Sequence, residues 1–308
     1  MTTAHVYDTV ILGGGPAGLT AALYAARAGL DVLILERLCA GGQMALTHRI
    51  DNYPGFPEGI EGISLGEAMK IHAERFGAVT KYDQITAAEL LGSPKLLHGD
   101  EGDYPGKTVI LATGAIPRRL GLAGEKNLLG RGLSYCAACD GMFYRGKQVA
   151  VVGGGNSAVS EALLLSKLAR HVTLIHRGAS LRTGKAEYEA LLKAENVSTR
   201  WNNQVCALSY GDRLTGVRLK DTKIGEETAI ACDGLFVSIG RIPATDLFQG
   251  QLELDSAGYI PADETTQTRI PGVYAIGDVR KKPLRQIVTA TSDGAVAAVM
   301  AQRYLSAE

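Results

Sequence analysis

The sequence predicts an α/β fold built from two Rossmann-like, three-layer domains, the second inserted into the first. A strand, a glycine-rich turn, a helix and a second strand follow one another near the N-terminus, and a close copy of this unit begins at about residue 147. Each copy is later followed by an apolar run that ends in Gly-x-Ile-Pro. Glycine makes up 38 of 308 residues, about 12% against a typical ~7%. It clusters in short loops, as phosphate-binding turns require.

The first unit has the spacing of a dinucleotide-binding motif. Its elements are a strand at 7–12, a turn at 13–18, a helix at 19–28 and a strand at 31–35. In a G-x-G-x-x-G turn, the first glycine (Gly13) allows the tight turn and the second (Gly15) lets the backbone approach a pyrophosphate. The third (Gly18) lets helix and strand pack closely, and the acid ending the second strand (Glu36) accepts from a ribose hydroxyl. The unit predicts dinucleotide binding. The alternative is an ordinary glycine turn in a parallel sheet.

The second unit repeats the first but differs where the ribose is recognised. It comprises a strand at 147–152, a turn at 153–158, a helix at 159–169 and a strand at 171–175. The position equivalent to Glu36 is His176, followed by Arg177. A carboxylate favours a free ribose 2′-hydroxyl, whereas arginine pairs with a 2′-phosphate. We therefore expect FAD in the first unit and NADPH in the second, with Arg177 and Arg182 as phosphate contacts. The alternative for these two arginines is a solvated surface.

The two Ile-Pro segments mark where the chain crosses between domains. Proline and the residue before it disfavour a continuing helix. We place the second domain at 116–245 and the first at 1–115 and 246–308. A buried strand at 272–278 and an Ala-rich helix at 285–305 are expected to close the first domain. Two linkers at one boundary make a natural hinge.

Composition narrows the class of protein. Lys plus Arg and Asp plus Glu both number 32, which argues against a nucleic-acid or membrane surface built on bulk charge. No apolar run approaches the ~18 residues of a membrane helix. The stretch Met1 to Val6 carries no apolar secretory region. Five cysteines with one close pair do not form a disulfide framework. We expect a cytoplasmic protein.

A C-x-x-C lies between the two nucleotide units, at Cys136 and Cys139, with Asp140 immediately after it. Its spacing lets both sulfurs join in one small ring, so the order of motifs predicts a relay from pyridine nucleotide to flavin to disulfide. Half a zinc site would need a second pair of ligands, and the remaining cysteines are isolated, so we expect no metal. Two inert core cysteines are the other alternative. The three other cysteines are Cys39, Cys206 and Cys232. Cys39 lies near the expected flavin loop, and the other two are expected to be small buried residues.

Over almost its whole length the chain resembles the low-molecular-weight thioredoxin reductases. The matching stretches are Gly13–Gly18, Gly41–Gln43, Asp51–Gly55, Ala112–Gly114, Ser134–Gly141, Gly153–Ala158, Gly277–Asp278, Arg285–Gln286 and Asp293–Gly294. The resemblance implies a homodimeric FAD protein that reduces the disulfide of thioredoxin. It further implies that the inserted domain rotates about its linkers, so that the disulfide and the nicotinamide reach the flavin in turn.

The resemblance also assigns roles to residues. Cys139 would lie next to the flavin, Cys136 would be the interchange thiol, and Asp140 would be the acid/base that protonates the departing thiolate. The implied FAD contacts are Gly13, Gly15, Pro16, Ala17, Gly18, Glu36, Gly42, Gln43, Asn52, Ala112, Thr113, Gly114, Gly277, Asp278, Arg285, Gln286 and Ile287. The implied NADPH contacts are Gly153, Gly155, Asn156, Ser157, Ala158, His176, Arg177, Arg182, Gly240 and Arg241.

One departure from the family pattern keeps the electron donor open. The family's loop reads His-Arg-Arg, whereas Gly178 follows Arg177 here. NADPH is the first expectation, relaxed use of NADPH and NADH the second, and reduced ferredoxin the third; the intact 153–158 turn counts against ferredoxin. A peroxiredoxin-type partner, a dithiol oxidase and a non-enzymatic nucleotide-binding module remain alternatives on the same scaffold. A second set of residues is either a thioredoxin docking face or a solvated charge run: Arg131, Arg280, Lys281 and Lys282.

Overall fold

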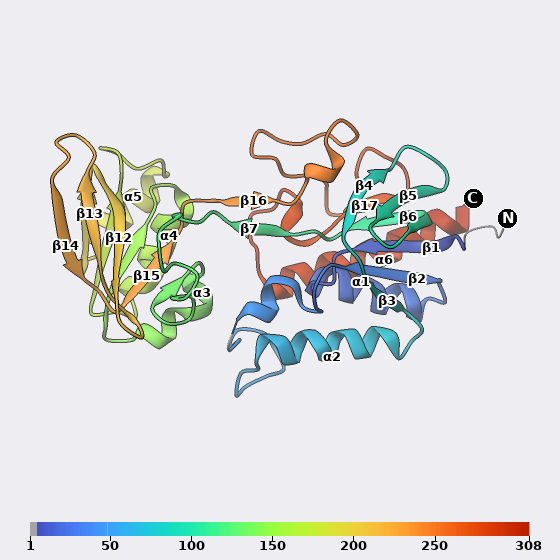
Figure 1. Ribbon diagram of the computed structural model, residues 1–308, viewed down its shortest axis with the longest axis horizontal. Helices are drawn as coiled ribbons and strands as arrows, with labels where there is room; N and C mark the ends of the chain where they lie inside the picture. Colours follow the sequence, from blue (N-terminus) through green and yellow to red (C-terminus); the bar gives the residue numbers. More distant parts are fainter. Residues whose placement is uncertain (1–4, 48, 308) are drawn as a thin grey trace. The chain divides into compact units, whose positions relative to one another are not determined.

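The computed structural model (Figure 1) describes residues 5–47 and 49–307. Residues 1–4 of the N-terminal stretch before the first strand lie outside the described residues. The chain divides into two compact units, the first made of Met1–Ile116 with Ile242–Glu308 and the second of Pro117–Arg241. Both are mixed α/β units around parallel sheets, so the predicted fold class is confirmed.

A seven-stranded sheet forms the centre of the first unit. Its order is β3 (Val79–Tyr82), β2 (Val32–Glu36), β1 (Tyr7–Leu12), β6 (Asp103–Leu111), β5 (Lys95–Gly99) and β4 (Ile85–Glu89), with β17 (Val273–Ala275) also paired to β6. Strands β3, β2, β1, β6 and β17 run parallel, and β4, β5 and β6 are antiparallel neighbours. The predicted strands at 7–12 and 31–35 correspond to β1 and β2.

Alternate residues of these strands face opposite sides of the sheet, as strand geometry requires. Ile11, Ile34 and Ile110 belong to a core with α1 (Pro16–Arg27) and α6 (Ile287–Ala307). Val10 and Leu33 belong to the core of the other face, which includes Phe248 of η3 (Asp246–Phe248). The remaining helical elements are α2 (Gly62–Glu74), η1 (Gly42–Leu46) and η4 (Gly277–Val279).

The second unit has three layers, two of which are sheets. A five-stranded parallel sheet runs in the order β11 (Val197–Trp201), β10 (His171–His176), β9 (Gln148–Val152), β15 (Gly234–Val237) and β8 (Leu133–Ser134). The helices of this unit are α3 (Ala137–Asp140), η2 (Gly141–Tyr144), α4 (Asn156–Ser166) and α5 (Lys185–Lys193). An antiparallel sheet of β12 (Asn203–Tyr210), β13 (Leu214–Asp221) and β14 (Glu227–Ala231) supplies Val205 and Val217 to the second core of this unit.

The two segments that cross between the units pair with each other. They are β7 (Ala115–Pro117) and β16 (Arg241–Pro243), which form a two-stranded sheet. Next to this pair, Arg118 N–H donates to the carbonyl of Gly240 at 2.9 Å, and Ala244 N–H donates to that of Gly114 at 3.0 Å. Each Ile-Pro therefore lies in a short strand.

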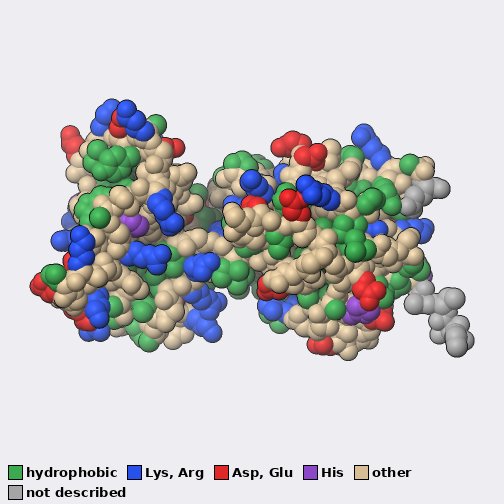
Figure 2. Space-filling view, turned by 90° about the horizontal axis from the view of Figure 1, so that it is seen from above, with side chains coloured by type: hydrophobic (Ala, Val, Ile, Leu, Met, Phe, Trp, Pro, Cys, Tyr) green, Lys and Arg blue, Asp and Glu red, His purple; other side chains and the backbone are tan. Residues whose placement is uncertain are grey.

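On the face shown in Figure 2, acidic and basic side chains are interspersed on the unit that carries the N-terminus. Between residues 5 and 307, His48 aside, none of the helices combines the length and the apolar character needed to span a membrane.

Candidate dithiol and nucleotide sites

Cys136 and Cys139 form a disulfide at the start of a single helical turn, with their Cα atoms 5.3 Å apart. Cys136 occupies the N-cap position of α3, and its sulfur accepts from the backbone N–H of Cys139 at 3.2 Å. The N–H of Cys139 is shared between this sulfur and the carbonyl of Cys136, which lies at 3.2 Å. The turn is thus built to supply a donor to a sulfur that becomes negative. Both cysteines are partly exposed.

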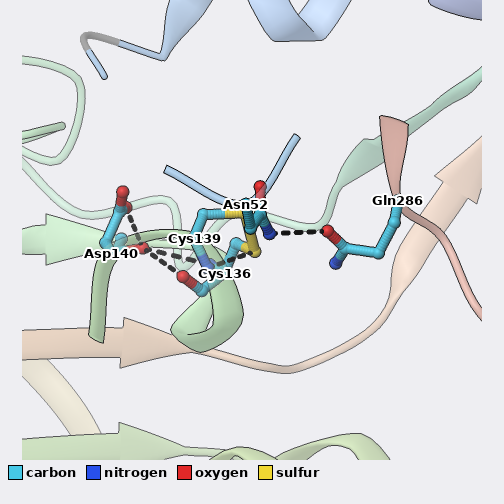
Figure 3. The surroundings of a disulfide bond; sticks show 6 residues. Asn52, Cys136, Cys139, Asp140 and Gln286 are labelled. Carbon is cyan, nitrogen blue, oxygen red and sulfur yellow. Dashed lines mark hydrogen bonds between the residues drawn. A yellow bond between two sulfur atoms is a disulfide. The ribbon is translucent and has the colours of Figure 1, made fainter. Parts of the chain in front are cut away.

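Asp140 is the partly buried acid of this turn (Figure 3). Its Oδ2 accepts from the hydroxyl of Ser134 at 2.6 Å, and the same hydroxyl oxygen accepts from the N–H of Cys136 at 3.0 Å. Burial raises the pKa of Asp140 above its ordinary value, and the Ser134 hydrogen bond offsets part of that rise. A raised pKa makes the protonated form of this carboxyl group more stable, which is the form that can donate a proton. Ser134 is itself buried, and its sequence context alone gave it no role.

The loop before the dithiol is held by a buried carboxylate. Glu125 accepts from the N–H groups of Leu120 and Gly121 at 2.8 Å each, and from the hydroxyl of Tyr135 at 2.6 Å. These hydrogen bonds hold its pKa below the usual range despite its burial. The residue directly before Cys136 is thereby anchored.

In the first unit, the glycine turn and Glu36 lie together. The Glu36 carboxylate accepts from the N–H of Gly14 at 2.7 Å and from that of Arg37 at 2.8 Å. A Cβ on Gly13 would overlap the carbonyl of Ala112, and one on Gly18 would overlap the carbonyl of Gly13. Gly15 is different, because a Cβ there would meet no atom within 4 Å in the part of the chain that the structure describes.

Two further segments meet this turn. The N–H of Gly41 donates to the carbonyl of Gly14 at 2.7 Å, which brings the loop with Gly42 and Gln43 beside it. The Gln43 amide donates to the carbonyl of Ala115. Thr113 donates through its hydroxyl to the carbonyl of Ala244 at 2.7 Å. The structure therefore groups the expected FAD contacts at the carboxyl ends of β1 and β6, where α/β sheets bind ligands.

The remaining expected FAD contacts come from the C-terminal segment and the Asn52 loop. Asn52 donates to the side-chain oxygen of Gln286 at 3.1 Å. The guanidinium of Arg285 lies 4.2 Å from the centre of the Tyr259 ring. Ile287 packs beside the small core of Met44, Ile50 and Leu65. Gly277 has a φ of 67° and abuts Ala17 of α1, and Asp278 follows it in η4.

A buried ion cluster corrects one expectation about the surface. Arg280 and Lys282 do not belong to a docking face or a solvated run, because their side chains are only 9% and 5% exposed. Asp293 accepts from Arg280 at 3.0 Å, from Lys282 at 2.7 Å and from the N–H of Gly277 at 2.9 Å. The cluster fixes the turn that carries Asp278. Only Arg131 and Lys281 of that set are exposed.

The second glycine turn has the same construction. A Cβ on Gly153 would overlap the carbonyl of Ser238, and one on Gly154 would overlap the His176 ring. Among residues 5–47 and 49–307, no atom lies within 4 Å of a Cβ added to Gly155. The N–H of Arg182 donates to the carbonyl of Gly154 at 2.7 Å. His176 and Arg182 thus border the turn at the place that Glu36 takes in the first unit.

The other expected NADPH contacts lie on neighbouring segments of this unit. Asn156, Ser157 and Ala158 form the first turn of α4. Arg177 follows β10, and its carbonyl accepts from Thr222 at 3.1 Å. Gly240, with a φ of 103°, and Arg241 follow β15.

Gly15 and Gly155 indicate whether the two turns have room for a nucleotide. At Gly13, Gly18, Gly153 and Gly154 the protein's own atoms exclude a side chain, but at Gly15 and Gly155 no atom of the described residues does. Glycine at these two positions leaves the backbone open to a ligand at the start of a helix, as pyrophosphate binding requires. Both turns therefore fit the phosphates of a dinucleotide.

Of the three free cysteines, one is buried as expected. Burial raises the pKa of Cys232 to about 12. Cys206 is only partly buried, and its thiol lies 3.3 Å from the carbonyl of Arg218. Cys39 is exposed.

Comparison with known proteins agrees with this geometry. Residues 7–294 match the model of the pyridine nucleotide-disulphide oxidoreductase family. The chain is 46% identical to a thioredoxin reductase of Coxiella burnetii and 44% identical to one of Peptoclostridium litorale, over 99% and 98% of this chain and 98% of each relative. A crystal structure of thioredoxin reductase from Streptococcus pyogenes superimposes with a TM-score of 0.92 at 41% identity, covering 99% of this chain and all of that one. The chain therefore belongs to the pyridine nucleotide-disulphide oxidoreductase family, within its thioredoxin reductase group.

Proposed function

We propose that this chain is a flavoenzyme that carries electrons from NADPH through FAD to the Cys136–Cys139 disulfide and on to thioredoxin. The observation that carries the proposal is the disulfide itself, formed at an N-cap with a partly buried acid directly behind it, in a unit that also holds a nucleotide turn. When bound, FAD supplies a carrier that accepts a hydride and delivers two electrons to a disulfide.

The chain's own residues would perform the exchange with thioredoxin. The Cys136 thiolate attacks the thioredoxin disulfide, and the leaving thioredoxin thiolate takes its proton from Asp140. The Cys139 thiolate then attacks the Cys136 sulfur, which re-forms the internal disulfide and releases the second thioredoxin thiol. The N–H of Cys139, which already contacts the Cys136 sulfur, stabilises that sulfur as a thiolate. Cys139 is the sulfur we assign to the flavin side.

The two glycine turns are the basis on which we assign the cofactor sites. We assign FAD to the site formed by Gly13–Gly18, Glu36 and Gln43, together with the 112–114 and 277–287 segments, in the unit that includes 1–116. We assign NADPH to the site formed by Gly153–Ala158, His176, Arg177 and Arg182, in the unit 117–241. Because the dithiol and the second turn share one unit, we propose that this unit reorients about β7 and β16 during turnover.

The protein partner needs an accessible contact area near the dithiol. Met142 and Phe143 follow Asp140 closely and are 55% and 46% exposed. We propose this apolar pair as part of the thioredoxin contact. A homodimer in the cytoplasm is the setting we propose; three free thiols beside one cycling disulfide suit a reducing compartment.

The test is a spectroscopic and thiol assay on the purified yellow protein. Addition of NADPH should bleach the flavin absorbance and release two new thiols per chain, and thioredoxin should be reduced catalytically. A Cys139→Ser variant should bind FAD but pass no electrons to thioredoxin, while Cys39→Ser should retain activity. A Cys139→Ser protein that still reduces thioredoxin would disprove the relay.

One observation favours NADH as a second electron donor. Gly178 follows Arg177 and supplies no cation for a 2′-phosphate, so we propose measurable turnover with NADH beside NADPH. Ratios of kcat/KM for NADPH, NADH and reduced ferredoxin separate these donors.

A further inference from the structure

Glu161 joins the two functional segments of the second unit. It lies on α4, and its carboxylate accepts from the backbone N–H of Ala137 and from the side chain of Ser238. Ala137 directly follows Cys136 and begins α3. Ser238 follows β15, and its carbonyl borders Gly153 of the second glycine turn. One side chain therefore contacts both the dithiol turn and the edge of the nucleotide turn.

The environment of this carboxyl group is unusual for a glutamate. Its Oε2 atom is buried and has no hydrogen-bond partner among the described residues. Burial raises the pKa of Glu161 to about 7, against the opposing influence of Arg241 and the two hydrogen bonds. Near neutral pH the group is thus divided between a neutral acid and a buried carboxylate.

We propose that Glu161 is a positioning residue that sets the balance between the disulfide and dithiol forms of Cys136 and Cys139. Reduction breaks the S–S bond, takes up two electrons and one proton, and leaves one thiol and one thiolate. A carboxylate bonded to the Ala137 amide puts a negative charge beside the residue that directly follows Cys136, where it opposes a second negative charge on a cysteine sulfur. The ionised form of Glu161 therefore favours the disulfide, and its neutral form favours the thiolate.

Other groups on the elements packed against α4 remain the same in any comparison of variants. They are Asp140 on α3; His171 and His176 on β10; Lys185, Glu187, Tyr188, Glu189 and Lys193 on α5; Lys167 at the end of α4; and Arg241 after β15. Because all of them are present in both proteins, the difference between wild type and a Glu161 variant reports on Glu161 alone.

The inference rests on the redox disulfide of the proposed function, but its test needs neither NADPH nor thioredoxin. The FAD-bound protein is equilibrated with mixtures of reduced and oxidised dithiothreitol, and free thiols are trapped with a maleimide and counted by mass. At pH 8, Glu161→Gln should shift the equilibrium toward the dithiol by about threefold to tenfold. At pH 6, where wild-type Glu161 is mostly neutral, the two proteins should agree within about twofold.

Glu189→Gln is the matched control, because it removes an exposed carboxylate from α5. It should match wild type at both pH values. A Glu161→Gln protein that matches wild type at pH 8, or differs equally at pH 6 and pH 8, overturns the proposal. Ser238→Ala provides a second variant should Glu161→Gln not fold: loss of one donor raises the Glu161 pKa, so the pH 7 equilibrium should move toward the dithiol, and an unchanged equilibrium contradicts the proposal.

Discussion

The hydroxyl of Ser134 donates to Asp140 at 2.6 Å while accepting from the backbone N–H of Cys136 at 3.0 Å. One buried hydroxyl therefore fixes both the acid and the backbone of the cysteine that we assign to interchange. Since this bond lowers the Asp140 pKa against the effect of burial, the position of the hydroxyl sets how readily Asp140 gives up its proton.

Replacement of Ser134 by alanine should raise the pKa of Asp140 further. The hydrogen bond that opposes the effect of burial is then lost. Because the proposed exchange uses protonated Asp140, the alkaline limb of the pH profile for thioredoxin reduction should move to higher pH. Ser134→Thr keeps the hydroxyl and should restore the wild-type profile. Identical limbs in wild type and Ser134→Ala would show that the bond does not tune Asp140.

The second glycine turn offers a pair of variants that separates binding from folding. Gly155→Ala should leave the free energy of unfolding within about 0.5 kcal/mol of wild type, because no atom of the residues that the structure describes lies within 4 Å of the added Cβ. It should raise KM for NADPH markedly, since the methyl group occupies space open to the phosphates. Gly153→Ala overlaps the carbonyl of Ser238 and should lose about 2 kcal/mol or more of stability. Urea unfolding and steady-state kinetics check both; an unchanged KM in Gly155→Ala contradicts the assignment.

Introduction of arginine at position 178 should increase preference for NADPH. A charge-assisted contact with the 2′-phosphate contributes about 1.5–3 kcal/mol, so the ratio of kcat/KM for NADPH over NADH should rise about tenfold or more. The new Cβ comes within 3.0 Å of the His176 ring, which must shift slightly. Gly178→Ala is the steric control and should not change the ratio. A ratio unmoved by Gly178→Arg argues against 2′-phosphate recognition at this loop.

Neutralisation of Asp293 should destabilise the first unit. Asp293→Asn leaves the buried cations Arg280 and Lys282 without their carboxylate, and loss of one member of a buried ion group costs about 3–5 kcal/mol. FAD should also dissociate more easily, because Asp293 holds the N–H of Gly277. Thermal unfolding and flavin release report the two effects. Glu253→Gln, which removes an exposed partner of Arg269, should do neither.

Glu161 should make stability depend on pH. Its folded pKa, about 7, is raised from 4.5, so the folded state binds more protons than the unfolded state between these values, and stability falls as pH rises through this window. Relative to Glu161→Gln, wild type should lose about 1–3 kcal/mol of unfolding free energy between pH 5 and pH 8. Chemical denaturation at several pH values tests this; a constant difference between the two proteins contradicts it.

Much of the fold could be predicted because its signals are local. The strands at 7–12 and 31–35, the helix after each glycine turn and the final helix follow from apolar runs, glycine spacing and Ala-rich composition, and the structure contains them as β1, β2, α1, α4 and α6. The antiparallel sheet of β12–β14 was not predicted. Its strands carry many exposed residues, and its role as a covering layer depends on which face Val205 and Val217 present to the core.

The site shows the same division between local and long-range signals. The glycine turns and the C-x-x-C could be found because each is contiguous. Glu161 was missed because its meaning depends on Ala137 and Ser238, which are distant in sequence. Arg280 and Lys282 were misread as surface charges because their partner, Asp293, lies one helical segment later. A lone charged residue in a sequence shows neither its burial nor its partner.

The first unit can be completed only late in synthesis, because two of its elements lie near the end of the chain. Strand β17 adds to β6, and α6 packs along α1, yet both come from the last quarter of the sequence. On the ribosome, the sheet that begins at residue 7 therefore lacks β17 and the covering helix α6 until synthesis is nearly complete. The contiguous unit 117–241 has all its strands by then and can fold while its host is still open. The emergence of the final helix, rather than that of the dithiol unit, is therefore the event that closes the flavin half of the molecule.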